Sequence, residues 1–258
     1  MAGKKNLLKK SAVSSEELTH NERLMLIGDY FVRLTQRLVG GKRSRHHKET
    51  GDIRHEELDA LIEVKGHGSP GDARVFTNQL ARWIEKADAF PGFSHCDYVL
   101  WTYRNWQGIR DGERNGASRK QRHIRPMGKE TPTEESLNRF LAHKTVSAFF
   151  VDATILQAMS AKEDMTKLSI QWHRPSVIVR TNQALLNDLA DHLHEKLAKL
   201  EINPKDFCVR RIRVAIRFKK NLMKFPIVLI LRKKHARQVM AAIKGRIEAR
   251  RRHGPANA

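Results

Sequence analysis

Residues 50–67 read Thr-Gly-Asp-Ile-Arg-His-Glu-Glu-Leu-Asp-Ala-Leu-Ile-Glu-Val-Lys-Gly-His, and this pattern predicts a short β-hairpin. Its second half has the alternation of a strand, in which successive side chains point to opposite faces. The alternation places Glu63 and Lys65 on one face, and a turn at 54–57 would return Asp52 beside Glu63. We therefore expect the hairpin to gather two carboxylates and one ammonium group.

Such a cluster has a definite chemistry. Two carboxylates can hold Mg²⁺, because this hard cation prefers oxygen ligands and usually keeps several waters. A lysine beside the ion can orient or deprotonate a water, or stabilise the charge that develops on a phosphate. Asp59 shares the strand face of Glu63 and is the alternative to Asp52 as a ligand. Asp52 is preferred, because four residues along one strand separate two side chains by roughly 13 Å.

These residues resemble a known motif. Gly-Asp-Ile, a gap of nine residues and Glu-Val-Lys are similar to the signature of the PD-(D/E)xK nuclease superfamily. That superfamily includes type II restriction enzymes, archaeal Holliday-junction resolvases and the endonuclease subunits of some transposons. Gly51 stands where the motif has proline. The resemblance covers roughly residues 15–104 and implies a restriction-endonuclease-like αβββαβ core, with the Val64 backbone carbonyl as a candidate third metal ligand.

The resemblance also implies roles for side chains. Asp52 and Glu63 would bind Mg²⁺, for which Mn²⁺ is the expected substitute, and Lys65 would position or activate the water. Family members often carry a glutamate in the first helix that reaches the metal, and a glutamine near it in the helix after the hairpin. Glu22 and Gln79 occupy comparable positions, although each also fits an ordinary surface side chain.

The flanks of the hairpin have the element order of this core. A capping box at Ser14 and Glu17 predicts a helix that ends near Val39. A second helix is expected over 72–89, and a buried strand over 96–103. The order helix, strand pair, helix, strand is what the nuclease core requires.

Charge indicates the partner. The 258 residues include 49 Lys and Arg against 28 Asp and Glu, a formal net charge of +21. Basic residues placed on phosphates release condensed counterions, so a charge this large favours a polyanionic partner, here double-stranded DNA. General RNA affinity or solubility alone are the alternatives.

Other classes of partner lack a signal. The longest apolar run, 225–231, is too short to span a bilayer, and nothing resembles a signal peptide. There is no P-loop or nucleotide-binding glycine fingerprint, so neither a membrane nor a nucleotide cofactor is expected. Cys96 and Cys208 are the only cysteines and lie far apart in the sequence, which favours a reducing cytoplasm.

Composition divides the chain into segments. They are a flexible basic arm (1–14), the nuclease core (15–104), a basic loop (105–130), a helical segment (131–173) and a basic βαββα unit (174–258). Within the helical segment, helices are expected over 137–142 and 146–159. The fold class is therefore mixed α/β (α+β).

The last segment is the expected DNA-binding unit, with homodimer formation as its alternative role. Over 209–219 apolar and basic residues alternate, so the basic ones should face outward. The candidate DNA contacts lie on this strand, on the final helix and in the basic loop; they are Arg211, Arg213, Arg217, Lys219, Arg246, Arg250, Arg119 and Arg122.

The sequence thus predicts a Mg²⁺-dependent DNA endonuclease, site-specific or structure-specific, of a phage, mobile element or restriction system. A Holliday-junction-resolvase-like nuclease is one alternative. A non-catalytic nucleic-acid-binding protein that retains the nuclease fold is another.

Overall fold

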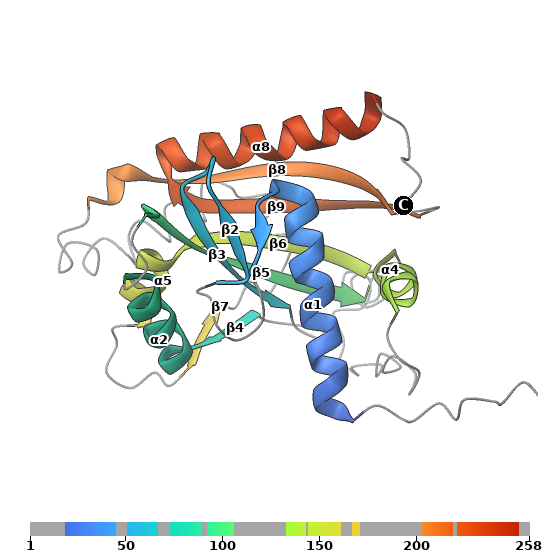
Figure 1. Cartoon of the computed structure of the whole chain (residues 1–258), viewed down its shortest axis with the longest axis horizontal. Helices are drawn as coiled ribbons and strands as arrows, with labels where there is room; N and C mark the ends of the chain where they lie inside the picture. Colours follow the sequence, from blue (N-terminus) through green and yellow to red (C-terminus); the bar gives the residue numbers. More distant parts are fainter. Residues whose placement is uncertain are drawn as a thin grey trace, which may run out of the picture.

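The computed structural model describes residues 19–44, 51–66, 73–88, 92–105, 133–142, 144–160, 167–170, 203–218 and 221–252 (Figure 1). These residues form a mixed α/β structure built on a seven-stranded mixed sheet. The helices are α1 (His20–Val39), α2 (Thr77–Asp88), α4 (Glu134–Ala142), α5 (Ala153–Ser160) and α8 (Lys233–Arg252). Among the residues described, no helix is long and apolar enough to cross a membrane.

The strands are β1 (Lys42–Arg43), β2 (Ile53–His55), β3 (Ala60–Gly66), β4 (Ala73–Phe76), β5 (His95–Asn105), β6 (Lys144–Asp152), β7 (Lys167–Ile170), β8 (Phe207–Phe218) and β9 (Asn221–Arg232). The large sheet has the order β1-β2-β3-β5-β6-β9-β8, and β4 pairs with β7 in a separate two-stranded sheet. The pairs β3–β5 and β6–β9 are parallel, and the other neighbours are antiparallel.

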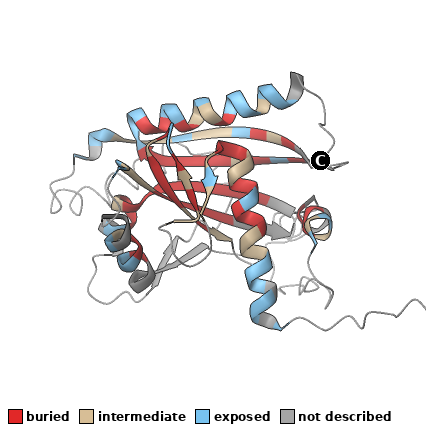
Figure 2. Cartoon of the chain, viewed as in Figure 1, coloured by how far each residue is buried: buried red, intermediate tan, exposed pale blue. Residues whose placement is uncertain are grey.

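Helices cover both faces of the sheet, and each face has its own core (Figure 2). We call the side covered by α1, α4 and α8 the α8 face; Ile62, Val99 and Ile227 are buried there. The side covered by α2 and α5 is the α2 face, where Leu61 and Val228 are buried. Because side chains alternate along a strand, the register of the sheet fixes which functional residues share a face.

Helix α1 begins later than the sequence suggests. Its N-cap is Thr19, and the capping box is completed by Glu22. The Thr19 amide donates to Glu22 Oε2 at 2.8 Å, and the Glu22 amide donates to Thr19 Oγ1 at 3.3 Å. The expected capping residues Ser14 and Glu17 lie outside the described residues. Both tetrapeptides satisfy the same cap pattern, and the second one forms the cap.

Two other expected helices require correction. Residues 144–152 form β6, a central strand, and only Ala153–Ser160 of the predicted 146–159 helix is helical. The strand is buried on both faces, with Phe150 on the α8 face and Phe149 on the α2 face. A strand buried on both faces is almost continuously apolar and lacks the alternation that distinguishes it from a helix. The segment 131–173 is therefore mixed rather than helical.

The predicted 72–89 helix is shorter than expected. Residues Ala73–Phe76 form β4, which pairs with β7, and α2 starts at Thr77. Pairing with a strand that lies some ninety residues later decides this boundary, so the local sequence could not place it.

The carboxy-terminal strands do not form a separate sheet. Strand β9 pairs with β6 in parallel, and β8 pairs with β9. The segments 15–104 and 174–258 thus both contribute strands to one sheet. The predicted division into a nuclease core and a separate basic unit does not correspond to a division of this sheet. The arm 1–14, most of the loop 105–130, and residues 174–202 of the expected βαββα unit lie outside the described residues.

Candidate functional site

The hairpin brings Asp52 beside Glu63. In the β2–β3 ladder Ile53 stands opposite Ile62, so the preceding residue, Asp52, stands opposite Glu63. The Asp52 amide donates to the Ile62 carbonyl at 2.8 Å, which holds Asp52 against β3 just before β2 begins. The turn between the strands occupies residues 56–59. The expected pairing is therefore present, with the turn two residues later than predicted.

The carboxylate of Asp52 is fixed against β3. The Val64 amide donates to Asp52 Oδ2 at 2.8 Å. Burial raises the pKa of Asp52, while the Val64 hydrogen bond and the positive charges of Lys65 and Arg43 partly offset this effect. The carboxylate is thus held in place by the backbone and lies within the electrostatic field of the lysine.

Glu63 and Lys65 form a close ion pair on the same strand. Lys65 Nζ lies 2.6 Å from Glu63 Oε1. The Lys65 side chain is 33% exposed and the Glu63 side chain is 17% exposed. They alternate with Ile62 and Val64, which are buried on the α8 face, so both point to the α2 face. A partly exposed carboxylate, a second carboxylate opposite it and an ammonium group thus meet at one accessible place.

The backbone of Val64 adds an oxygen to this cluster. In an extended strand, the N–H and C=O of one residue point to the same side of the chain. Because the Val64 N–H donates to Asp52, the Val64 carbonyl also points toward the β2 side of β3. Among the described residues no three His, Cys, Asp or Glu side chains gather to hold a metal. Two carboxylates and a carbonyl, with waters, are nevertheless a ligand set that suits Mg²⁺.

Tyr98 is a member of this cluster that sequence reasoning missed. It stands opposite Glu63 in the parallel β3–β5 ladder and is buried. Burial raises the pKa of Tyr98, and the negative charges of Glu63 and Asp52 raise it further. Its ring packs edge-on against Trp83 of α2, with centroids 4.8 Å apart. No local signal marks this tyrosine, since its place depends on the pairing of two strands joined through a helix.

Glu22 lies elsewhere. Its Oε2 accepts hydrogen bonds from the amide and the hydroxyl of Thr19, both at 2.8 Å, on the exposed first turn of α1. These bonds lower the pKa of Glu22. Nine residues, about 13 Å of helix, separate it from Phe31, whose ring abuts Gly66 at the end of β3. The structure therefore gives Glu22 a capping role and does not bring it to the hairpin.

Asp59 is also apart from the carboxylate pair. Asp59 belongs to the turn, with φ of 51°, and not to the strand as expected. Hydrogen bonding to Ser94, the residue before β5, lowers the pKa of Asp59. Four residues, roughly 13 Å, separate it from Glu63 along β3. Gln79 lies in the first turn of α2, and its side chain is outside the described residues.

The arginines of β8 share the face of the carboxylates. Val214 and Ile216 are buried on the α8 face, so Arg211 and Arg213 point to the α2 face, as do Glu63 and Lys65. Arg213 is exposed and Arg211 is partly buried. One row of the sheet runs from Lys65 through Leu100, Phe149 and Val228 to Arg211. Four strand spacings make this row about 19 Å long.

The remaining candidate DNA contacts are scattered. Arg246 and Arg250 are exposed on α8, which covers the opposite face of the sheet. Arg217 lies on β8, but its side chain is outside the described residues. Lys219, Arg119 and Arg122 fall outside the described residues altogether.

A second charged cluster, which the sequence did not suggest, lies under the start of α8. His235 Nε2 lies 2.6 Å from Asp97 Oδ2, and both side chains are fully buried. The His95 ring stacks on His235 with centroids 3.9 Å apart. Asp152 stands opposite Asp97 in the β5–β6 ladder, and its Oδ1 accepts the Thr154 amide at 2.8 Å, which caps α5. This cluster joins strand β5 to the last helix.

Comparison with known proteins gives no match: no protein-family model matches the chain, and no curated protein or solved structure does either.

Proposed function

We propose that this chain is a Mg²⁺-dependent endodeoxyribonuclease that hydrolyses phosphodiester bonds at the β2–β3 hairpin. The observation that carries the proposal is the meeting of Asp52, Glu63 and Lys65 on one partly exposed stretch of the α2 face. The order α1, β2–β3, α2, β5, with β3 and β5 parallel, is compatible with a restriction-endonuclease-like core.

The donor set fits a hard cation. Asp52 and Glu63 supply two carboxylates, and the Val64 carbonyl points to the side on which Asp52 lies. These residues would hold Mg²⁺, with waters completing its shell. When bound, the ion would polarise the phosphate oxygens and promote deprotonation of a water. The raised pKa of Asp52 fits this role, because a bound cation would stabilise the buried carboxylate in its ionised form.

Each protein group has a separate task. The Val64 amide already holds the Asp52 carboxylate in one orientation, so this carboxylate would not have to reorganise during the reaction. The Lys65 ammonium lies where it can donate hydrogen bonds to a water or to a phosphate oxygen, and Glu63 holds it there. Buried Tyr98 stands beside Glu63 on the neighbouring strand β5 and would limit the access of bulk water from that side.

The basic strand supplies binding. Arg211 and Arg213 lie on the α2 face, about 19 Å across the sheet from Lys65. Guanidinium groups bind phosphates strongly and bidentately. Because α2 and α5 cover the buried residues between the two sites, a duplex held by β8 would have to pass over these helices to reach the carboxylates.

The test is cleavage by the full chain. Supercoiled plasmid, linear duplex and a four-way junction are incubated with Mg²⁺, with Mn²⁺ and with EDTA. The proposal requires cleavage with either metal and none with EDTA, and the junction arm separates a resolvase-like specificity from duplex cleavage. Tight binding of all substrates with no cleavage in any arm would instead favour a non-catalytic nucleic-acid-binding protein, which the net charge of +21 also supports.

A further inference from the structure

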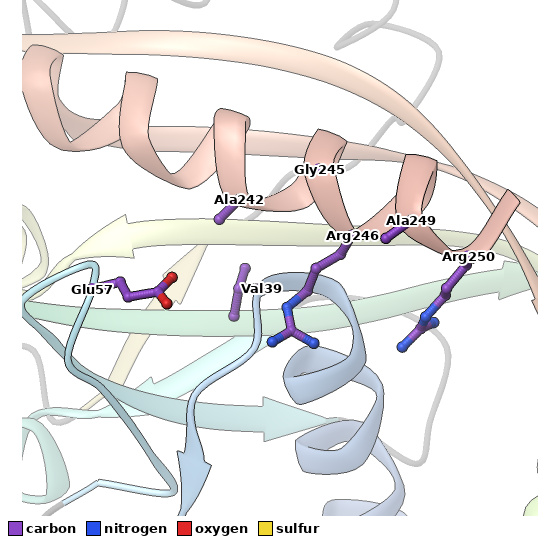
Figure 3. A pocket seen from close by; sticks show the side chains of 7 residues that line it. All are labelled: Val39, Glu57, Ala242, Gly245, Arg246, Ala249 and Arg250. Carbon is purple, nitrogen blue, oxygen red and sulfur yellow. The ribbon is translucent and has the colours of Figure 1, made fainter. Parts of the chain in front are cut away.

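A groove of about 470 Å³ runs between α8 and the end of α1 (Figure 3). The wall that α8 contributes has two kinds of residue. Ala242, Gly245 and Ala249 are small and leave room, while Arg246 and Arg250 point from α8 toward α1. A stripe of small residues would normally let two helices pack closely, but here the space remains open.

The two arginines are crowded by positive charge. A Cβ on Gly40, whose φ is 96°, would collide with the Arg246 guanidinium, so the glycine lets this group lie against the end of α1. Burial and the positive charges of Arg37 and Arg246 lower the pKa of Arg250. Arg37 pairs with Glu134 at 2.8 Å. Within the described part of the chain, no carboxylate forms an ion pair with Arg246 or Arg250.

The groove has opposite character at its two ends. Glu57, exposed in the turn between β2 and β3, stands at the end away from the arginines. Val39 and Ala242 lie between them and are apolar (Figure 3). A ligand that matches this groove has an anionic group at one end, a hydrogen-bond donor at the other and a flat or apolar middle.

We infer that this groove binds a nucleotide unit, with its phosphate on Arg246 and Arg250 and its base between Val39 and Ala242. Guanidinium groups match phosphate geometry, and the volume lies in the range of small-ligand sites. Glu57 would accept a hydrogen bond from an exocyclic amine, which adenine, guanine and cytosine carry and thymine lacks.

The groove is independent of the proposed nuclease site. Helices α1 and α8 cover the α8 face, whereas Glu63 and Lys65 point to the α2 face. A nucleotide in the groove therefore lies across the sheet from the hairpin carboxylates. The inference stands even if the chain cleaves no DNA, and its test needs no metal.

The experiment titrates the metal-free full chain with dAMP, dTMP, deoxyadenosine and inorganic phosphate by isothermal calorimetry. We expect dAMP to bind more tightly than dTMP, and both more tightly than the nucleoside or phosphate alone. A 5′-phosphorylated oligonucleotide added as competitor separates two sources of the same unit: displacement of dAMP assigns the groove to a strand end, and no displacement assigns it to a free nucleotide.

Variants locate the binding. Arg246→Gln and Arg250→Gln should each weaken dAMP binding about tenfold or more, since each removes a hydrogen bond between charged groups. Lys244→Gln is the matched control, because Lys244 is exposed on the same helix but does not line the groove. Glu57→Gln should reduce the preference for dAMP over dTMP.

A steric variant avoids any change of charge. A Cβ on Gly245 would meet no atom within 4 Å, so Gly245→Leu should be accepted by the helix and fill the groove. It should abolish dAMP binding with no loss of melting temperature. Equal affinity for inorganic phosphate and dAMP, equal weakening by Lys244→Gln, or full binding by the Gly245→Leu variant would each overturn the inference.

Discussion

The two charged clusters of the sheet contain similar groups in different surroundings. Asp52, Glu63 and Lys65 lie near the end of β3 on the α2 face and are partly exposed. Asp97 and His235 lie at the start of β5 on the α8 face and are fully buried. Each cluster places a basic side chain 2.6 Å from a carboxylate.

The two clusters differ in exposure, and this difference indicates a chemical role for the hairpin cluster and a structural role for the buried one. A buried ion pair is costly to break, because removal of one partner leaves an uncompensated charge in the interior. A partly exposed pair contributes little to stability, because water and ions screen it. The partly exposed hairpin cluster is therefore the one proposed to bind a metal and a phosphate, whereas the buried Asp97–His235 pair joins α8 to strand β5.

Removal of a hairpin group should abolish activity while leaving the fold intact. We expect Glu63→Gln and Lys65→Gln each to lower the cleavage rate by about 10²–10⁴-fold. Both groups would act on the reacting phosphate or water, whereas DNA affinity depends on many other cations. Rates come from plasmid cleavage, affinities from fluorescence anisotropy and stability from urea unfolding. Full activity of either variant would contradict the nuclease proposal.

Two aspartates provide the matched control. Asp52→Asn should be as inactive as Glu63→Gln, because Asp52 stands opposite Glu63 and is held by Val64. Asp59→Asn should retain activity within a factor of about three, since the turn places Asp59 beside Ser94 instead. If only the Asp59 variant is inactive, the metal site lies at the turn.

Removal of a buried group should have the opposite result, namely a loss of stability with no loss of activity in the folded protein. We expect His235→Ala to lower the free energy of unfolding by about 3–5 kcal/mol, because Asp97 would then be buried without its partner. Urea denaturation measures the change, and Arg237→Ala, exposed on the same helix, is the control. Activity of the folded fraction should remain. A loss below 1 kcal/mol would mean that the pair does not hold α8.

The hairpin could be predicted because its determinants are local. Alternation, the turn and the spacing of Asp52 and Glu63 all lie within eighteen residues. Tyr98 could not be predicted, because its position opposite Glu63 depends on a parallel pairing formed through α2. The same holds for Asp97 and His235, which are 138 residues apart in the sequence.

Strand order explains the other differences between the predicted and the observed fold. Strand β6 was expected as a helix because a doubly buried strand has no alternating pattern. The alternation of β8 was predicted from its sequence, and Val214 and Ile216 are indeed buried while Arg213 is exposed. That β8 belongs to the same sheet as the hairpin follows only from the β6–β9 pairing. A fragment such as 174–258 would lose this pairing, so point substitutions are better tests than truncation.

Protonation of the buried cluster should make stability depend on pH. Burial alone would lower the pKa of His235, but its hydrogen bond to Asp97 and the charges of Asp97 and Asp152 outweigh burial and raise it. The folded state then binds more protons, so this stabilisation is complete below about pH 6.5 and lost as pH rises through the raised pKa. Burial also raises the pKa of Asp97, so the contribution of Asp97 to stability likewise falls as pH rises.

His95 opposes this trend at lower pH. Burial and the charge of His235 lower the pKa of His95, so its contribution favours folding as pH rises toward 6.5. Above that pH, we expect the free energy of unfolding to fall with a slope of at most about 1.4 kcal/mol per pH unit. Urea unfolding between pH 6.5 and 9 measures it. His235→Asn should remove the slope, and an unchanged slope would assign it to another group.

The smallest expected effect concerns the basic face of β8. Replacing Arg211 and Arg213 by Gln should reduce the slope of log affinity against log salt by about 1.8, because each phosphate contact contributes about 0.9. Arg210→Gln is the matched control, since Arg210 is exposed on the same strand and alternates to the opposite face. Salt titrations of duplex binding measure both. If the Arg210 variant lowers the slope as much per residue as the pair, the duplex is not confined to the α2 face. The carboxylates of the hairpin and the arginines of β8 would then not act on one substrate, and dimer formation would be the better role for this strand.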